Sequence, residues 1–221
     1  MSLALPESVG PLRRERLRTA RLYFVCDARP GGESPEALLR AALGGGVDIV
    51  QLREKELSRT EIERSASTYR RICDTFSALF IVNDDPELAH ACDADGVHVG
   101  KTGEVAAARE LLGPDAIIGL STHGEEEIDA AAELPIDYFA VGPIWETPTK
   151  PGRAAVGLAP VAYAAEHAAH PFFGIGGVDP GNAAQVIEAG ATRLCVVRAI
   201  RDAADPGAAA AALRQGVAPG G

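Results

Sequence analysis

The sequence predicts an α/β protein, a single (β/α)₈ TIM barrel with a short N-terminal extension, and three observations support this. From residue 21 onward, short runs rich in β-branched or aromatic residues alternate with helix-like runs. Several strand-like runs are continuously apolar, which is typical of strands buried on both faces of a parallel sheet. The length of 221 residues suits one barrel domain.

The barrel is expected over 21–215, after an arm or helix at 1–20 and before a tail at 216–221 that we expect to be disordered. The expected strands are Arg21–Cys26, Val47–Leu52, Ala78–Val82, Gly96–Val99, Ala116–Leu120, Tyr138–Val141, Phe172–Ile175 and Arg193–Val197. The expected helices are Ser34–Leu43, Thr60–Phe76, Pro86–Cys92, Glu104–Leu112, Gly124–Glu133, Leu158–Ala168, Pro180–Ala189 and Asp205–Arg214. A flavodoxin-like doubly wound sheet is the structural rival, but it has fewer strands.

Composition and charge exclude several classes of function. A net charge of −10 argues against a general nucleic-acid surface. No run of about 18 apolar residues predicts a membrane span, and residues 1–20 lack the apolar core of a secretory signal. The four cysteines have no CxxC spacing, which favours a reducing compartment and therefore a cytoplasmic protein.

Unusual polar residues gather where the expected strands end, and this is the catalytic face of such barrels. After the second strand, alternation directs Gln51, Arg53 and Lys55 to one side and Leu52 to the other. An Arg fork and a Lys point charge suit a pyrophosphate. Surface ion pairs at a charged strand end are the alternative, and both interpretations stay open from these residues alone.

After the third strand, Asn83-Asp84-Asp85 places a carboxylate and an amide beside this anion site, as Mg²⁺ would require. For Asp85 we prefer the role of a helix N-cap, and for Asp84 both roles remain open. His98, inside an apolar strand, is interpreted as a hydrogen-bonded interior histidine. Ser121 is a hydroxyl donor to substrate or a helix cap, and the absence of a Gly-x-Ser-x-Gly elbow excludes a hydrolase of that type.

Two loops near the end of the chain suit phosphate binding. The segment 142–152 after the sixth strand is long, with hydroxyls and Lys150, and is typical of a mobile loop that closes over a substrate. The glycines of 174–177 precede a helix and would let backbone N–H groups approach a phosphate. Loops after the seventh and eighth strands are frequent phosphate sites in this fold.

Taken together, these motifs resemble those of the thiamin-phosphate synthase family over residues 21–200. The matching segments are Gln51-Leu52-Arg53-Glu54-Lys55, Asn83-Asp84, Gly96-Val97-His98-Val99-Gly100, Ser121-Thr122-His123, Thr147-Pro148-Thr149-Lys150 and Gly174-Ile175-Gly176-Gly177. The resemblance implies that hydroxymethylpyrimidine pyrophosphate loses pyrophosphate and that the nitrogen of thiazole phosphate attacks the released methylene. It thus implies a Mg²⁺-dependent transferase with two small-molecule substrates, and it leaves open whether the chain forms a homo-oligomer.

The resemblance also implies roles for individual residues. It assigns Asp84 to Mg²⁺, and Arg53, Lys55, Ser121 and Lys150 to catalysis. The substrate-binding residues that it implies are Gln51, Leu52, Arg53, Glu54, Lys55, Asn83, Ser121, Thr147, Pro148, Thr149, Lys150, Gly177, Val197 and Arg198.

The chain departs from the family pattern at three positions. Gly103 stands where the family has a second Mg²⁺-binding Asp, Lys101 where it has Gln, and Arg198 where it has Ser. Glu104 is one replacement for the lost carboxylate, through a small shift of the loop, and water is the other. Two alternatives therefore remain beside the synthase. One is a related thiazole tautomerase with a histidine at the position of His123, and the other is a degenerate barrel that binds thiamin precursors without turnover.

Overall fold

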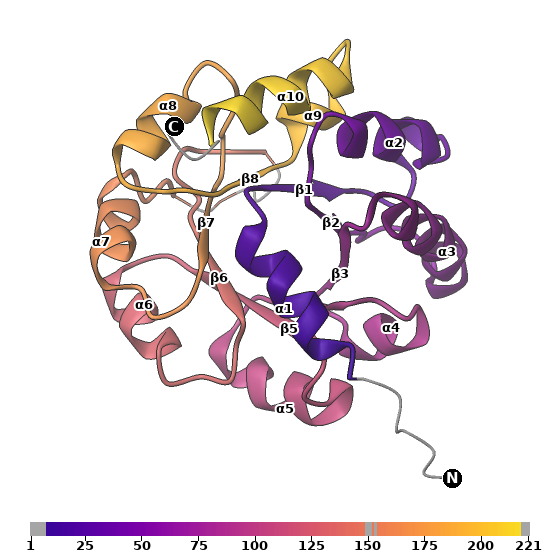
Figure 1. Cartoon of the computed structure of the whole chain (residues 1–221), viewed down its shortest axis with the longest axis horizontal. Coiled ribbons are helices and arrows are strands. Elements are labelled where there is room, and N and C mark those ends of the chain that lie inside the picture. The colour runs from indigo at the N-terminus through magenta and orange to yellow at the C-terminus, as the bar shows by residue number, and fades with distance from the viewer. Residues whose placement is uncertain (1–7, 149–151, 153, 218–221) are drawn as a thin grey trace, which may run out of the picture.

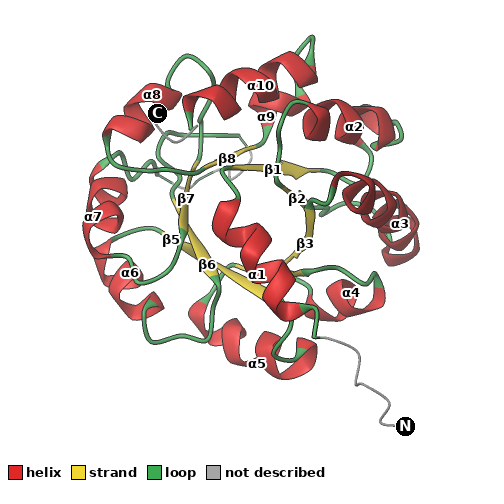
Figure 2. Cartoon of the chain, viewed as in Figure 1, coloured by secondary structure: helices red, strands yellow, loops and turns green. Residues whose placement is uncertain are grey.

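In the computed structural model, which describes residues 8–148, 152 and 154–217, eight parallel strands close into a barrel in sequential order. Figure 2 shows these strands as a ring surrounded by helices. The strands are β1 (Leu22–Cys26), β2 (Ile49–Leu52), β3 (Leu79–Asn83), β4 (Gly96–Val99), β5 (Ile117–Thr122), β6 (Tyr138–Val141), β7 (Phe172–Ile175) and β8 (Leu194–Val196). The predicted (β/α)₈ fold is confirmed, and the doubly wound sheet is excluded.

The helices that follow the strands are close to those expected from the sequence. They are α2 (Glu36–Gly44), α3 (Arg59–Phe76), α4 (Pro86–Ala91), α5 (Thr102–Leu112), α6 (Glu125–Ala131), α7 (Ala159–His167), α8 (Ala183–Glu188) and α10 (Pro206–Gly216). A 3₁₀ turn, η1 (Pro30–Gly32), follows β1, and a short helix, α9 (Arg198–Arg201), follows β8. Neither of these two elements was predicted.

The start of α8 corrects the sequence-based prediction. Pro180 was expected to begin this helix, but the carboxylate of Asp179 accepts hydrogen bonds from the backbone N–H groups of Gly181 and Asn182, at 2.7 and 3.2 Å. These bonds close a turn, so α8 begins only at Ala183. The C-terminal boundary also moves, because α10 continues through Gly216 and Val217 is buried. These two residues belong to the barrel rather than to the expected tail, whose last residues, 218–221, lie outside the described residues.

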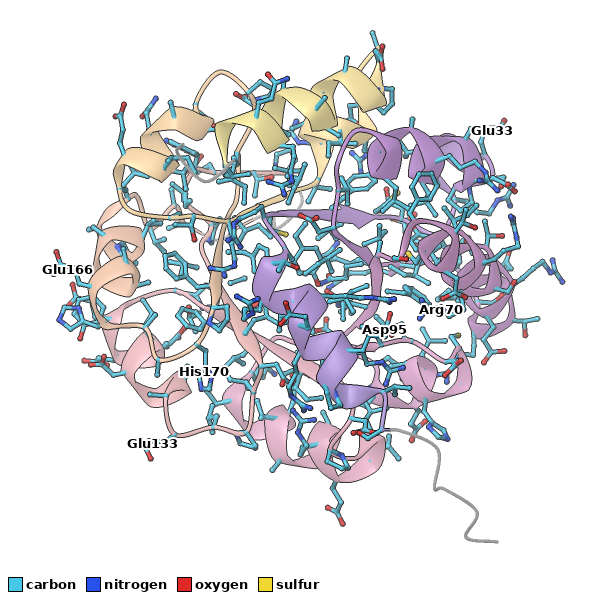
Figure 3. The ribbon with its side chains drawn as sticks, viewed as in Figure 1. Glu33, Arg70, Asp95, Glu133, Glu166 and His170 are labelled. Atoms are coloured by element: carbon cyan, nitrogen blue, oxygen red, sulfur yellow. The ribbon has the colours of Figure 1, made fainter. Side chains whose placement is uncertain are left out.

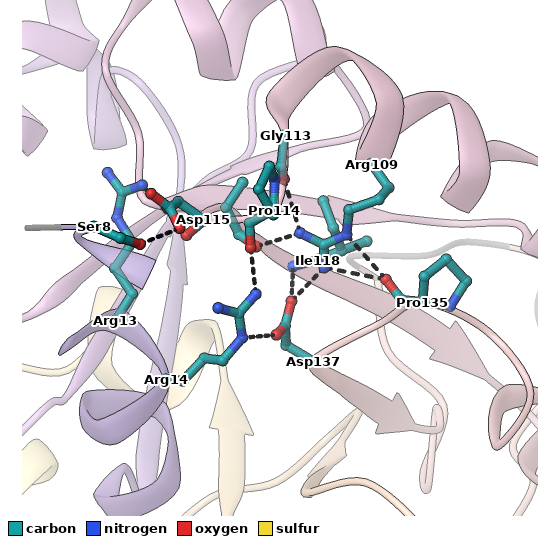
Figure 4. A network of polar contacts seen from close by, with 11 residues as sticks. Ser8, Arg13, Arg14, Arg109, Gly113, Pro114, Asp115, Ile118, Pro135 and Asp137 are labelled. Atoms are coloured by element: carbon teal, nitrogen blue, oxygen red, sulfur yellow. Dashed lines mark hydrogen bonds and ion pairs between the residues drawn. The ribbon is translucent and has the colours of Figure 1, made fainter. Parts of the chain in front are cut away.

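The extension at the N-terminus forms α1 (Gly10–Thr19), which lies across the N-terminal opening of the barrel (Figure 1). Leu17 is buried against the interior core, and the polar face of α1 reaches carboxylates at the starts of two strands. Arg13 pairs with Asp95 at 2.8 Å. Arg14 pairs with Asp137, also at 2.8 Å, as Figure 4 shows. The helix therefore closes the end of the barrel opposite the predicted site.

The hydrophobic core has two layers, separated by the sheet. The outer layer lies between strands and helices and includes Leu52. The inner layer fills the barrel, and its residues are Leu17, Ala20, Tyr23, Val25, Ile49, Leu79, Ile81, Ile117, Tyr138, Phe173 and Cys195. Because successive strand residues point to opposite faces, the two layers are contributed by alternate positions of the same strands.

Candidate functional site

The carboxyl ends of the strands surround a cavity of about 370 Å³. Most of the residues predicted from the sequence meet in its wall. Those are Gln51, Arg53, Lys55, Asn83, Asp84, Ser121, Thr147, Gly177, Val197 and Arg198. A shallow groove, which we call the mouth groove, adjoins the cavity and is lined by Asp27, Arg29, Glu54, Glu56, Lys101, Glu104, His123, Pro148 and Arg201, among others.

The end of β2 supplies part of the cationic wall of the cavity. Gln51, Arg53 and Lys55 all line it, as the alternation of the strand predicted. The side chain of Leu52, only 2% exposed, points the other way into the outer core. Leu52 was predicted to bind substrate as part of the motif, and its side chain is not in a position to do so.

Glu54 has a structural task at the mouth of the barrel. Its carboxylate accepts hydrogen bonds from the backbone N–H groups of Ala28, Lys55 and Glu56, at 3.2, 2.8 and 3.0 Å. It thereby joins the loop after β1 to the loop after β2, and it lines the mouth groove rather than the cavity. In this position Glu54 holds the backbone of Lys55, whereas the motif had suggested contact with substrate.

The two carboxylates after β3 are distinguished by their backbone conformations. Asp84 has a φ of +59° and its N–H donates to the carbonyl of His98 at 2.8 Å. Aspartate tolerates this left-handed conformation better than most residues do, and the exposed carboxylate of Asp84 lines the cavity. Asp85 instead caps α4, because its carboxylate accepts from the N–H of Leu88 at 2.7 Å. The predicted cap is confirmed for Asp85.

The segment around Gly103 determines which residues could hold a metal. Gly103 lies in the first turn of α5, and a Cβ there would meet no atom within 4 Å. Glu104 accepts the backbone N–H of Lys101 at 3.2 Å, so its carboxylate caps α5. Among the described residues, no three His, Cys, Asp or Glu side chains form a metal cluster. A Mg²⁺ ion usually keeps several waters and binds one or two carboxylates plus substrate phosphates, and Asp84, which shares the cavity wall with Arg53 and Lys55, fits such a site.

His98 is the interior histidine that the sequence suggested, and both of its ring nitrogens have hydrogen-bond partners. Its Nδ1 lies 3.1 Å from the hydroxyl of Tyr138, and its Nε2 lies 3.0 Å from the hydroxyl of Ser121. Sequence reasoning missed Tyr138 and also Tyr23, whose hydroxyl lies 2.8 Å from that of Tyr138. Both tyrosines occupy inward positions of their strands, and this alternation is the signal that could have found them.

Burial perturbs the acid–base chemistry of these two tyrosines. Both side chains are almost completely buried in the interior of the barrel. Burial raises the pKa of Tyr23 and of Tyr138 well above the usual range, because an interior phenolate would lose its hydration. Both residues therefore keep their hydroxyl protons at neutral pH.

The loops after β6 and β7 pack against each other at the cavity wall. Thr147 lines the cavity and Pro148 the mouth groove, whereas the predicted Thr149 and Lys150 lie outside the described residues. Gly177 has a φ of +69°, and a Cβ on it would lie 2.8 Å from the Cβ of Trp145. This glycine thus permits close contact between the two loops.

The cavity wall after β8 is formed by α9, which the sequence did not predict. Arg198 begins this helix, and its neighbours Val197 and Ala199 also line the cavity. Arg201 faces the mouth groove and pairs with Asp27 and Asp202 at 2.9 and 2.7 Å. Sequence reasoning missed Asp27, Asp202 and Asp179 at this end of the barrel, because single acidic residues in loops carry no distinctive pattern.

His123 lies beside the cavity rather than in its wall. Its Nδ1 is 2.8 Å from the carboxylate of Glu127, one turn along α6, and its backbone N–H donates to the same carboxylate at 2.8 Å. The residue lines the mouth groove. The histidine on which a tautomerase would depend is therefore bound to an acidic partner outside the cavity.

Comparison with known proteins places this architecture in a family. Residues 22–200 match the family model described as thiamine monophosphate synthase. The chain is 48% identical to the thiamine-phosphate synthase of Acidothermus cellulolyticus, over 88% of this chain and 93% of that protein. It is also 48% identical to the thiamine-phosphate synthase of Thermobifida fusca, over 91% and 94%. The solved thiamine phosphate pyrophosphorylase from Pyrococcus furiosus is 31% identical, with a TM-score of 0.81 over 93% of this chain and 97% of that one.

Proposed function

The chain belongs to the thiamine monophosphate synthase family and is a transferase, and from this premise we propose how its cavity carries out the reaction. Hydroxymethylpyrimidine pyrophosphate and thiazole phosphate bind together, and thiamin phosphate and pyrophosphate leave. The observation that carries this proposal is the shared wall of the cavity, where Arg53, Lys55 and Arg198 stand with the carboxylate of Asp84. Cations beside a carboxylate suit a pyrophosphate and its divalent metal.

The chemistry consists of one bond broken and one formed. The C–O bond between the pyrimidine methylene and pyrophosphate breaks, and its electron pair leaves with the pyrophosphate. The lone pair of the thiazole nitrogen then forms the new C–N bond at the methylene carbon. Arg53 and Lys55 hold the departing pyrophosphate and stabilise its growing negative charge, which lowers the barrier to departure.

Asp84 and the phosphate oxygens of the substrate would hold Mg²⁺, which supplies further neutralisation of the leaving group. Gly103 contributes no carboxylate, so water would take the place of that ligand in our proposal. Lys101, which lines the mouth groove beside Asp84, adds a positive charge near the same phosphates. This positive charge would neutralise part of the phosphate charge and so compensate in part for the missing second metal ligand.

The inner end of the cavity protects the electron-deficient methylene from water. Val25, Ile175 and Cys195 are apolar side chains of its wall, and Tyr23 lies with them. A cation formed at the methylene would react with any water within reach. An apolar surround leaves the thiazole nitrogen as the available nucleophile.

Two observations favour the synthase over its alternatives. A tautomerase would use His123, which pairs with Glu127 outside the cavity wall. A degenerate barrel would have no need for Arg53, Lys55 and Asp84 to converge on one cavity.

We further propose a cytoplasmic location. Cys26, Cys73, Cys92 and Cys195 are all free thiols, which suits a reducing compartment. In the part of the chain that the structure describes, no helix is both long and apolar enough to cross a membrane.

The test is an assay on purified protein with both substrates and a Mg²⁺ titration, in which thiamin phosphate and pyrophosphate are measured together. We expect the two products in a one-to-one ratio, at a rate that rises with Mg²⁺ and saturates. Folded protein that binds either substrate but forms no product at saturating Mg²⁺ would instead identify a degenerate barrel or a tautomerase. Conversion of the thiazole substrate to an isomer without pyrophosphate release would select the tautomerase.

A further inference from the structure

A continuous chain of side-chain hydrogen bonds crosses the interior of the barrel beneath the cavity. The Nε2 of Gln51 lies 2.6 Å from the hydroxyl of Tyr23, and that hydroxyl lies 2.8 Å from the hydroxyl of Tyr138. From Tyr138 the chain continues through the ring of His98 to Ser121, with distances of 3.1 and 3.0 Å. It thus joins five strands, β2, β1, β6, β4 and β5, and both of its ends line the cavity.

The packing around this chain preserves its geometry. Phe173 contacts the rings of both tyrosines edge-on, with centroids 5.3 Å from Tyr23 and 5.6 Å from Tyr138. Gly119 is the position that admits the contact between Tyr138 and His98. A Cβ on Gly119 would overlap the hydroxyl end of Tyr138 and would lie 2.6 Å from the Nδ1 of His98. The absence of a side chain at this one position therefore makes room for the third bond of the chain.

The direction of the hydrogen bonds follows from the donor capacity of each group. The Nε2 of Gln51 is an amide nitrogen, which only donates, so the Tyr23 hydroxyl accepts at this end. Each tyrosine hydroxyl carries one hydrogen, which burial retains. If the Tyr23 hydroxyl donates its hydrogen bond to Tyr138, the Tyr138 hydroxyl in turn donates to the Nδ1 of His98. His98 then carries its hydrogen on Nε2 and donates it to the Ser121 hydroxyl.

The opposite direction uses the donors less well. If Ser121 donated to His98 and His98 to Tyr138, the Tyr23 hydroxyl would accept from both Tyr138 and Gln51. Tyr23 would then have to direct its own hydrogen away from both neighbours in the chain. An unsatisfied donor in a buried site costs about 1–3 kcal/mol, so the first direction is favoured.

We infer that Tyr23 and Tyr138 are positioning residues that fix His98 as its Nε2–H tautomer and thereby make Ser121 a hydrogen-bond donor to the substrate. With Nε2 donating to its oxygen, Ser121 has its own hydrogen available for an acceptor atom in the cavity. The matching atom is an unprotonated ring nitrogen or a phosphoryl oxygen. This inference rests on the proposed function only for the identity of the substrate, because the tautomer is a property of the free protein.

The first test measures the tautomer directly, without any substrate. Full-length protein labelled with ¹⁵N at its five histidines is studied by long-range ¹H–¹⁵N NMR at pH 8, above the ordinary imidazole pKa of about 6.5. A His98→Asn variant assigns the signals. We expect His98 as the Nε2–H form in the wild type and a mixture of tautomers in Tyr138→Phe, since phenylalanine keeps the ring and loses the donor. An Nδ1–H form in the wild type, or no change in Tyr138→Phe, would overturn the inference.

The second test asks whether Tyr138 acts through Ser121. We expect Tyr138→Phe to lower kcat by about tenfold, the value of one neutral hydrogen bond, with KM within about twofold of the wild type. A double variant with Ser121→Ala should be no slower than Ser121→Ala alone, because the tyrosine has nothing left to orient. If the two substitutions lowered kcat multiplicatively in the double variant, Tyr138 would not act through Ser121.

A matched control separates this effect from a general loss of packing. Tyr69 is equally buried, but it lies in the outer core, and its hydroxyl donates to the carbonyl of Asp27 at 2.7 Å. Tyr69→Phe should lower Tm about as much as Tyr138→Phe while leaving kcat and the His98 tautomer unchanged. If the control lowers kcat as much as Tyr138→Phe does, the fall in kcat results from a loss of stability and not from the hydrogen-bond chain. If neither the wild type nor any variant forms product, the proposed function is wrong. The NMR measurement still tests the role of the hydrogen-bond chain in that case.

Discussion

At the scale of single residues, local backbone conformation separates chemical function from structural support. Asp84 and Asp85 are neighbours with the same side chain. The left-handed conformation of Asp84 directs its carboxylate to the cavity, whereas Asp85 caps α4 and pairs with Arg59 at 2.8 Å. The sequence showed two equivalent candidates, and only Asp85 could be assigned from it, because an Asp before a proline is a frequent helix cap.

This difference predicts opposite outcomes for one chemical change at two adjacent positions. Asp84→Asn should reduce Mg²⁺-dependent turnover by at least about 100-fold, or roughly 2.7 kcal/mol, and leave Tm near the wild-type value. Asp85→Asn is the control, because asparagine caps helices about as well as aspartate, and it should keep turnover within about threefold. Initial rates at saturating Mg²⁺ and thermal unfolding measure both. Wild-type turnover in Asp84→Asn would show that this carboxylate does not hold the metal.

Gly103 permits the complementary experiment, a gain of function. A side chain here meets open space and stands in the first turn of α5, where a carboxylate favours the helix dipole. Gly103→Asp should lower the Mg²⁺ concentration for half-maximal rate on the order of tenfold, or about 1.4 kcal/mol of metal affinity. Gly103→Ala tests the effect of a side chain without charge. An unchanged or higher requirement in Gly103→Asp would mean that this loop does not approach the metal.

At the scale of elements, a carboxylate is repeated at the starts of three of the four even strands, β2, β4 and β6. Asp48, Asp95 and Asp137 immediately precede β2, β4 and β6, and each accepts a backbone N–H from the neighbouring odd strand, at 3.0, 2.8 and 2.8 Å. Cations cover these carboxylates, as Figure 3 shows for Arg70, 2.9 Å from Asp95. The helix α1 supplies two more cations, Arg13 and Arg14. The carboxylates that bind neighbouring strands of the barrel to each other therefore also hold α1 to the barrel.

The attachment of α1 predicts a contrast between two of its arginines. Arg13 reaches the buried Asp95, and Arg18 pairs with the exposed Glu15 on its own helix. Arg13→Ala should lower the free energy of unfolding by about 1–3 kcal/mol, since it removes a charged hydrogen bond from a buried carboxylate. Arg18→Ala should change it by less than about 0.5 kcal/mol. Urea unfolding measures both, and equal effects would show that α1 is not anchored through Asp95.

At the scale of the whole molecule, an acidic protein brings three cationic side chains together with three carboxylates in the wall of one cavity, and it places apolar groups in two core layers. The net charge of −10 coexists with the cationic wall of Arg53, Lys55 and Arg198. The core also takes in thiols, and burial raises the pKa of Cys26 and of Cys73 to about 12 in each case. These thiols stay protonated at neutral pH, and the thiolate is the reactive form.

Thiol labelling of the folded protein should follow this burial. At pH 8, an alkylating reagent should modify the partly exposed Cys92 first and leave Cys26 and Cys73 unmodified until the protein unfolds. Free thiols in the unfolded chain ionise above about pH 8.5, so the free energy of unfolding should also fall as pH rises from about 9 towards 12. Mass spectrometry of timed samples identifies the labelled residue. Rapid labelling of Cys26 or Cys73 in the native protein would contradict the packing of the core.

Periodicity determined the fold and the cationic side of the site. The alternation of β2 was enough to place Gln51, Arg53 and Lys55 in one cavity, and the order of strands and helices was enough for the barrel. Only the tertiary structure decided that Leu52 lies in the outer core, that Glu54 joins two loops, and that His123 lies outside the cavity wall.

The reason is the range of the interactions involved. Alternation and helical periodicity are local properties, and a sequence displays them directly. The hydrogen-bond chain from Gln51 to Ser121 depends on residues from five strands and on the space beside Gly119. Such contacts exist only once the barrel closes, because closure brings positions distant in sequence within hydrogen-bond distance of each other.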